Sequence, residues 1–102
     1  MPQVQQHSPR GSIHLTGPTI VRMMRKHRRT IRGLAASMRI TQKRVREARA
    51  QGVHEWTGVW DWLEAITQES WTKAEVCGPR AAAYVASLYC HPPRRIPPVT
   101  QA

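Results

Sequence analysis

The chain has 102 residues, of which 40% are hydrophobic and eight are proline, and its formal net charge is +10 at pH 7. This length allows one compact domain with tails, and a core of that size is usually helical or supported from outside. No run approaches the ~18 apolar residues of a membrane span, and no basic-then-apolar leader follows Met1. We therefore expect neither a membrane span nor a secretory signal.

The positive charge is confined to the first half of the chain. Residues 1–53 hold twelve Lys or Arg residues and one acid, Glu47, whereas residues 54–102 hold four basic residues and five acids. The two net charges are +11 and −1. This segregation favours a polyanionic partner, because cations near phosphates release condensed counterions and add affinity without sequence selectivity. An anionic membrane surface and a merely solvated basic face are the alternatives.

The first residues predict an arm and then a helix. Residues 1–15 are polar and interrupted by two prolines and by Gly11, which predicts a flexible basic arm. A first helix is expected from near Pro18 to about Arg28, because proline suits the first helical turn. Its apolar positions lie on one side, so that most of its basic residues point outward.

The segment IRGLAASMRITQKRVREARA, residues 31–50, predicts two short helices around a turn. Its apolar and small residues change phase near residues 39–41, which one continuous helix would not require. Five cations and one carboxylate lie between Arg39 and Arg49. Two helices that share one small core explain the pattern, and the second of them has the composition of a DNA-reading helix.

Caps set the expected limits of these two helices. Thr30 is the expected N-cap of a helix that ends at Met38. Thr41 is the expected N-cap of the next helix, which ends at about Gln51. Gly52 fits a C-terminal stop.

The second half predicts two more helices and a tail. The fourth is expected from residue 57 to residue 67, and the fifth from Pro79 to about Cys90. Residues 92–102 contain too many prolines for a helix or strand and are expected to be extended or disordered. The apolar packing positions are Val59, Trp60, Trp62, Leu63 and Ile66 in the fourth helix, and Ala82, Val85, Ala86, Leu88 and Tyr89 in the fifth. The sequence thus predicts an all-α fold, a compact bundle of about five helices with flexible tails.

Small and apolar residues around the turn carry a resemblance. Ala35 is small where the second and third helices would cross, Ile40 is the apolar residue after the turn, and Val45 lies inside the third helix. In these features residues 17–53 resemble the helix-turn-helix of phage-repressor-type transcriptional regulators, the Cro, C1 and XRE-like proteins. The resemblance implies a compact helical DNA-binding domain.

Two positions depart from the pattern of that family. Arg39 stands where the family often has glycine, so we expect Arg39 to adopt a left-handed or otherwise constrained backbone. Ile31 stands where the family frequently has a glutamine that contacts a phosphate, and this contact is not expected here.

Helical geometry divides the third helix into two faces. At about 100° per residue, Thr41, Val45, Ala48 and Gly52 share one side, which we expect to face the core. The outward side chains are candidates for base contacts in a major groove, where glutamine pairs with adenine, Lys or Arg with guanine, and glutamate with cytosine. These candidates are Gln42, Lys43, Arg46 and Glu47. Glu47 is alternatively expected to orient Arg46.

A second set of residues is expected to contact DNA phosphates. They are basic or hydroxylic residues on the first three helices and at the helix starts: Arg25, Lys26, Arg29, Thr30, Arg32, Thr41, Arg44 and Arg49. An ordinary solvated face is the competing interpretation. It explains less, because cations in the first turns of a helix oppose the helix dipole by a few tenths of a kcal/mol each.

Three tryptophans dominate the fourth helix and its start. The chain has no phenylalanine, so Trp56, Trp60 and Trp62 are expected to close a small core. Part of this surface is alternatively a dimer interface. A two-fold dimer would place two recognition helices about 34 Å apart, on successive turns of one DNA face.

Catalysis and metal binding have little support in the sequence. The acids are scattered at helical-surface spacings, and the five histidines form no ligand pair or nucleophile constellation. Cys77 and Cys90 lack CxxC spacing and offer too few neighbouring ligands for zinc, so both are expected to be reduced and buried. We expect no catalytic residue, metal, cofactor or small-molecule ligand.

These observations predict a sequence-specific double-stranded DNA-binding transcriptional regulator. The expected form is a cytoplasmic, nucleoid-associated homodimer that represses by occluding a promoter at an inverted repeat. The expected organisation is an arm (1–15), a helix-turn-helix region (16–53), a packing and dimerisation region (54–91) and a Pro-rich tail (92–102). The alternative is an RNA-binding or protein-interaction adaptor, perhaps antitoxin-like, whose basic helices grip an acidic partner. Peripheral membrane attachment is a weaker alternative, because the cations do not border one long apolar face.

Overall fold

A computed structural model describes residues 10–89 of the chain, and this part is all-α, as the sequence predicts. Its six helices are α1 (Gly17–Lys26), α2 (Ile31–Met38), α3 (Gln42–Gln51), α4 (Trp56–Thr67), α5 (Lys73–Val76) and α6 (Pro79–Tyr89). The predicted Pro-rich tail and Cys90 lie outside the described residues.

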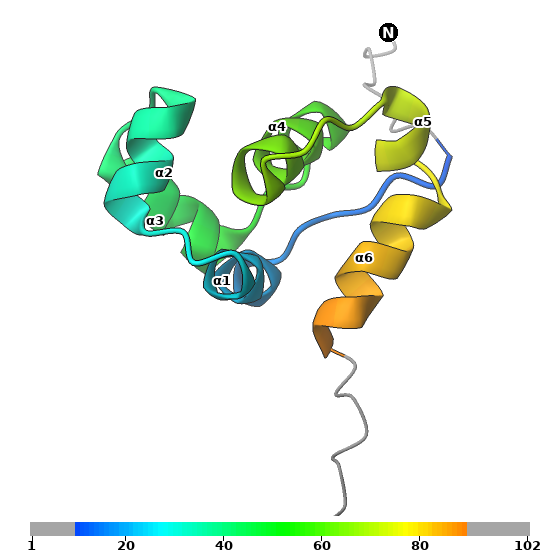
Figure 1. The fold of residues 1–102 in the computed structure, drawn as a ribbon, viewed down its shortest axis with the longest axis horizontal. Coiled ribbons are helices and arrows are strands. Elements are labelled where there is room, and N and C mark those ends of the chain that lie inside the picture. The colour runs from blue at the N-terminus through cyan, green and yellow to red at the C-terminus, as the bar shows by residue number, and fades with distance from the viewer. Residues whose placement is uncertain (1–9, 90–102) are drawn as a thin grey trace, which may run out of the picture.

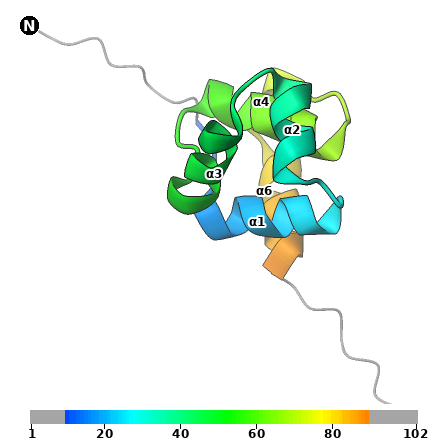
Figure 2. The same cartoon turned by 90° about the vertical axis from the view of Figure 1, so that its left-hand side faces the viewer.

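Helix α1 is the central element of the arrangement. In Figure 1, α2 and α3 lie on one side of α1, and α6 lies on the other. Helix α1 packs against α3, α4 and α6, while α4 also contacts α2 and α5. Figure 2 shows α1 crossing in front of α6, with α2 and α3 on the viewer's side. Helix α3 is therefore supported by α1, whereas α2 packs against α3 and α4.

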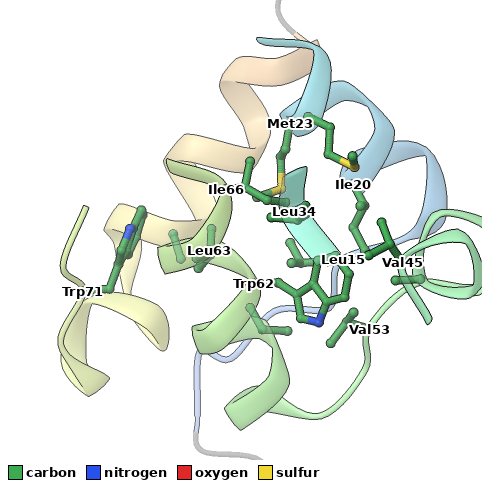
Figure 3. Packing of buried hydrophobic residues seen from close by; sticks show 14 of the residues in the cluster. Leu15, Ile20, Met23, Leu34, Val45, Val53, Trp62, Leu63, Ile66 and Trp71 are labelled. Carbon is green, nitrogen blue, oxygen red and sulfur yellow. The ribbon is translucent and has the colours of Figure 1, made fainter. Parts of the chain in front are cut away.

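One hydrophobic core joins the basic and near-neutral halves. Residues from both halves, such as Ile20, Leu34, Trp62 and Ile66, belong to the same buried cluster. Figure 3 shows Trp62 beside Leu15 and Val53, so residues before α1 and after α3 close the core against α4. The described residues before and after residue 53 thus fold around a shared core.

Threonine caps begin the basic helices as the sequence predicts. The hydroxyl of Thr30 accepts a hydrogen bond from the backbone N–H of Gly33 at 2.9 Å, and that of Thr41 accepts from Arg44 at 3.0 Å. Each bond satisfies one of the free donors at a helix start. The helix end predicted at Gly52 is also confirmed, because α3 ends at Gln51 and Gly52 has a φ of 87°, a backbone conformation that favours glycine.

The expected left-handed backbone is found in the connection between α2 and α3. Arg39 has φ 59° and ψ 45° and forms the C-cap of α2. Its backbone N–H donates to the carbonyl of Ala36 at 3.3 Å, and the next N–H, of Ile40, donates to Ala35 at 3.0 Å. The connection therefore satisfies two of the last carbonyls of α2, those of Ala35 and Ala36, while a non-glycine residue occupies a strained backbone region.

Replacing Arg39 with glycine is expected to stabilise the protein. Because an L-residue in this conformation costs about 1–2 kcal/mol, partly offset by the greater chain entropy of glycine, we expect a gain of about 1 kcal/mol. Ala36→Gly is the control, because it introduces glycine at an exposed position inside α2 and should cost about 1 kcal/mol. Urea unfolding measures both, and a loss of stability for Arg39→Gly would contradict the assigned strain.

The expected flexible arm is wrong for residues 10–15. Leu15 is fully buried and pairs with Val53 through two hydrogen bonds of 2.9 and 2.7 Å between their backbones. The pairing is a single antiparallel bridge, and it places Leu15 in the core beside Trp62 of α4. The only sequence signal is the alternation of Ile13, His14 and Leu15, in which His14 is exposed.

The second half differs from the prediction in two respects. The sequence pattern does not predict α5, because four residues are too few to show helical periodicity; the local signal for its start is the capping box formed by Thr72 and Glu75. The packing face of α6 is the expected one only in part: Val85 and Leu88 pack against the core as predicted, whereas Ala82, Ala86 and Tyr89 are exposed. Ala81 and Tyr84, which were not among the predicted packing residues, are buried and partly buried.

Candidate nucleic-acid interface

Helix α3 is held on α1 and α2 by its small and apolar face. Val45 and Ala48 are buried, as the helical spacing predicts, whereas Thr41, expected on the same side, is exposed at the helix start and Gly52 is partly buried. A Cβ atom at Gly17 would lie 2.5 Å from the carbonyl oxygen of Arg49, so the absence of a side chain lets the start of α1 approach the end of α3. This close packing fixes the opposite face of α3 toward the outside.

The residues predicted to contact bases lie on that outward face. Gln42, Lys43 and Arg46 are exposed, and Glu47 is partly buried. The guanidinium of Arg46 donates a long bond of 3.4 Å to Oε1 of Gln42 across one turn. Glu47 lies 3.9 Å from the guanidinium of Arg44, with both side chains about half exposed. The expectation that Glu47 orients Arg46 is therefore wrong, because Gln42 is the residue bonded to Arg46.

The predicted phosphate contacts divide into accessible and internally bonded groups. The exposed cations are Arg25, Lys26, Arg32 and Arg44. The hydroxyl oxygens of Thr30 and Thr41 accept the cap bonds described above, which leaves each O–H proton free to donate to an anion. These six residues retain a group that could bond a phosphate oxygen.

Arg29 and Arg49 have internal partners instead. Nε of Arg29 donates to the backbone carbonyl of Ile66 at 2.9 Å, close to the end of α4. The guanidinium of Arg49 contacts the sulfur of Met24 at 3.5 Å. Both side chains are partly buried. Their structural contacts tie α4 and α1 to the basic helices, a role that the sequence pattern did not indicate.

The acids of the described second half that form ion pairs do so within that half. Arg80 bonds Glu69 at 2.7 Å and Glu75 at 2.9 Å, so two of the five acids after residue 53 share one arginine. Glu64 accepts from the backbone of Trp71 at 2.9 Å. The basic half has only Glu47 to compensate its cations. The positive charge of the basic half is therefore not balanced by ion pairs across the fold among residues 10–89.

The three tryptophans have different environments. Trp62 is 4% exposed and belongs to the core. Trp56 and Trp60 are partly exposed and stack with ring centroids 6.0 Å apart. Nε1 of Trp60 donates to the backbone carbonyl of Trp71 at 2.8 Å, which braces the α4–α5 connection. Trp62 thus has the predicted core role, while the ring of Trp56 stacks with Trp60 and lies 5.2 Å from the ammonium of Lys73.

His27 and Tyr84 form the polar part of the α1–α6 contact. Nε2 of His27 lies 2.9 Å from the Tyr84 hydroxyl. Partial burial, followed by the nearby charges of Lys26 and Arg29, lowers the pKa of His27 below its ordinary value of 6.5, and Glu69 acts in the opposite direction. A depressed pKa means that the unfolded chain binds the proton more readily than the folded chain.

This difference predicts a pH dependence of stability. The free energy of unfolding should fall as the pH decreases through 6.5 toward the lower pKa of folded His27, because protonation favours the unfolded chain there. In His27→Gln this part of the dependence should be lost. Urea unfolding of both proteins between about pH 7 and pH 5 measures it, and identical slopes would contradict the role of His27.

Other types of site find no counterpart among the described residues. Between Arg10 and Tyr89, no three His, Cys, Asp or Glu side chains converge as ligands of a metal ion would. No helix in that range is long and apolar enough to cross a membrane. Cys77 is a free thiol and is partly buried against the core.

No family model matches the chain, and no curated protein or solved structure matches it either.

Proposed function

We propose that this protein is a sequence-specific double-stranded DNA-binding transcriptional regulator that reads the major groove with α3. The observation that carries the proposal is the exposed polar face of α3, formed by Gln42, Lys43 and Arg46 on a helix held by its buried face. These side chains have the donors and acceptors that distinguish base pairs in a major groove. The short α2–α3 connection leaves the first turn of α3 uncovered.

The charge of the first half supports a nucleic-acid partner. Phosphates supply the negative charge that the basic helices lack, and α1, α2 and α3 all carry exposed cations. Arg32 and Arg44 are the proposed phosphate contacts beside the reading face of α3, whereas Arg25 and Lys26 on α1 are proposed to contact phosphates farther from α3. Thr30 and Thr41 add hydroxyl donors at the starts of α2 and α3.

The proposed working form is a cytoplasmic homodimer on an inverted repeat. Two copies related by two-fold symmetry present two α3 helices to successive turns of one DNA face, about 34 Å apart. Such a dimer would repress by covering a promoter. The Trp56 and Trp60 stack is the proposed contact surface, because its aromatic side chains are only partly covered by the chain's own residues.

Selection from random duplexes tests this function. Purified protein is incubated with a pool of random double-stranded DNA at near-physiological salt, and the retained molecules are sequenced after several rounds. Enrichment of an inverted repeat is expected. Retention of DNA without any motif would reject sequence-specific reading, and preferential retention of a matched RNA pool would favour the RNA-binding adaptor instead.

A further inference from the structure

A second basic surface lies between α1 and α6. A groove of about 340 Å³ is lined by Arg22, Arg25, Lys26 and Leu88. The three cations lie on adjacent turns of α1, at spacings of three and four residues, and all three are exposed. Neither the groove lining nor any residue of α1 supplies a carboxylate. Like charges at these spacings repel one another, so an anion in the groove would relieve the repulsion.

Arg22 is oriented toward this groove by α6. Its guanidinium donates to the backbone carbonyl of Leu88 at 3.3 Å and lies 4.4 Å from the ring centroid of Tyr89. The hydroxyl of Tyr89 is in turn 2.7 Å from Oγ1 of Thr19 on α1. A guanidinium has five N–H donors, so these contacts leave donors available for another acceptor. The arginine is therefore held in place by α6 without being neutralised.

Lys26 is supported in a similar way by Tyr84. Its ammonium lies 5.3 Å from the centroid of the Tyr84 ring. Burial, with a smaller contribution from Glu69, raises the pKa of Tyr84 to about 12, so the phenol stays neutral at physiological pH. The Glu69 carboxylate itself is bonded to Arg80 at 2.7 Å. Both tyrosines thus position cations of α1 through ring faces and leave the positive charge of the groove intact.

The position of α6 is fixed from the opposite side. The ring of Tyr84 packs edge-on against Trp71, with centroids 6.1 Å apart, and the guanidinium of Arg80 lies 3.8 Å from the Trp71 ring. Trp71 is buried in the core cluster. Because α6 is attached to the core in this way, the groove is a preformed surface of the fold.

The groove and the reading face of α3 lie on different sides of α1. In Figure 1, α3 is on one side of α1 and α6 is on the other, and in Figure 2 α1 crosses in front of α6. A short duplex seated on α3 would therefore meet this groove only if the duplex extended past the segment that α3 reads.

We propose that the groove between α1 and α6 binds the phosphate backbone of DNA that flanks the segment read by α3. This inference rests on the proposed function and adds to it a second, sequence-independent contact. Two arginines and a lysine without carboxylate partners match the geometry and charge of phosphate oxygens. The consequence is a binding site longer than the base sequence that the protein recognises.

Duplex length and salt dependence test the groove. The selected sequence is placed in a short duplex and in one extended by about one helical turn, ten base pairs, at each end. For the wild-type protein, extension should raise affinity about tenfold or more. In the variant Arg22→Gln, Arg25→Gln, Lys26→Gln, this gain should largely disappear. On the long duplex, the slope of log K against log salt concentration should become shallower by about 0.9 for each lost phosphate contact, hence by about 2.7.

A charge-matched variant separates the groove from general electrostatics. Arg10→Gln, Arg28→Gln, Arg39→Gln removes the same charge from exposed arginines outside the groove. It should keep the gain in affinity on extension, and circular dichroism should show that both variants are folded. Ethylation of flanking phosphates should weaken binding of the wild type but not of the groove variant.

The outcomes distinguish the two proposals. Suppose that the wild type selects a sequence but the groove variant keeps the full gain in affinity when the duplex is extended. This result would overturn the groove proposal and leave the proposed reading role of α3 intact. A wild type that selects no sequence would overturn the proposed function. In that case the groove proposal also fails unless affinity for random duplexes rises with length and this rise requires the three groove residues. Tighter binding to vesicles of anionic lipid than to any duplex would overturn both.

Discussion

Trp62→Ala is expected to destabilise the protein by about 3–5 kcal/mol, the usual cost of removing a large aromatic side chain from a core. Trp62 is 4% exposed and packs beside Leu15 and Val53, where residues before α1 and after α3 meet α4. A domain of this size has a total stability of about 5–15 kcal/mol, so much of the protein should unfold at modest temperature. The α3 surface would then lose the support that orients it.

Trp56→Ala provides a matched control on the same helix. The ring of Trp56 is partly exposed and touches mainly Trp60 and Lys73, so its removal should cost no more than about 1.5 kcal/mol. Urea unfolding followed by far-UV circular dichroism compares the two variants without relying on tryptophan fluorescence. Equal destabilisation by the two substitutions would contradict the difference between a core ring and an outer ring.

The sequence predicted the helices that carry strong local signals. Thr30 and Thr41 mark helix starts through their side-chain chemistry, and Gly52 marks a stop through its backbone freedom. These signals are local, so they can be read without knowing the tertiary structure. The change of apolar phase predicted a turn near Arg39, whereas the left-handed backbone found there was expected only from the family resemblance, in which glycine often occupies this position.

Features that depend on distant partners were not predictable in the same way. The bridge between Leu15 and Val53 joins segments 38 residues apart, and the alternation of Ile13, His14 and Leu15 is too short to predict a strand-like segment. Which residues of α6 pack inward depends on contacts with Trp71 and α1 that its many alanines do not specify. Local patterns therefore located most helices, whereas the packing of residues 10–15 and of α6 required the tertiary structure.

In the candidate interface, too, the features set by local spacing were predictable and those set by distant partners were not. Spacing alone assigned the inward and outward faces of α3, since Val45 is buried and Arg46 is exposed. Spacing could not distinguish free arginines from internally bonded ones, because the partners of Arg29 and Arg49 lie on other helices. Arg22 was not assigned a specific role for the same reason, since Leu88 and Tyr89 orient it. The net charge thus predicts the kind of partner, while the tertiary contacts decide which cations remain available.

Arg46→Ala is expected to reduce discrimination between the selected DNA sequence and random DNA by roughly 5- to 150-fold. The estimate corresponds to the loss of one good bidentate base contact, about 1–3 kcal/mol. Arg46 is exposed on α3 and makes only a long bond of 3.4 Å to Gln42, so its removal should leave the fold intact. Binding to random DNA should fall much less than binding to the selected sequence.

Arg25→Ala is the matched substitution on α1, where the same residue type is proposed to contact only phosphate. It should weaken binding to selected and random duplexes by about the same factor, and should make the log–log salt slope shallower by about one. Titrations of both variants with both duplexes at several salt concentrations separate the two effects. If the two substitutions lowered specific and random binding equally, α3 would not be the reading helix, because a base contact must act on the difference between sequences whereas a phosphate contact acts on both.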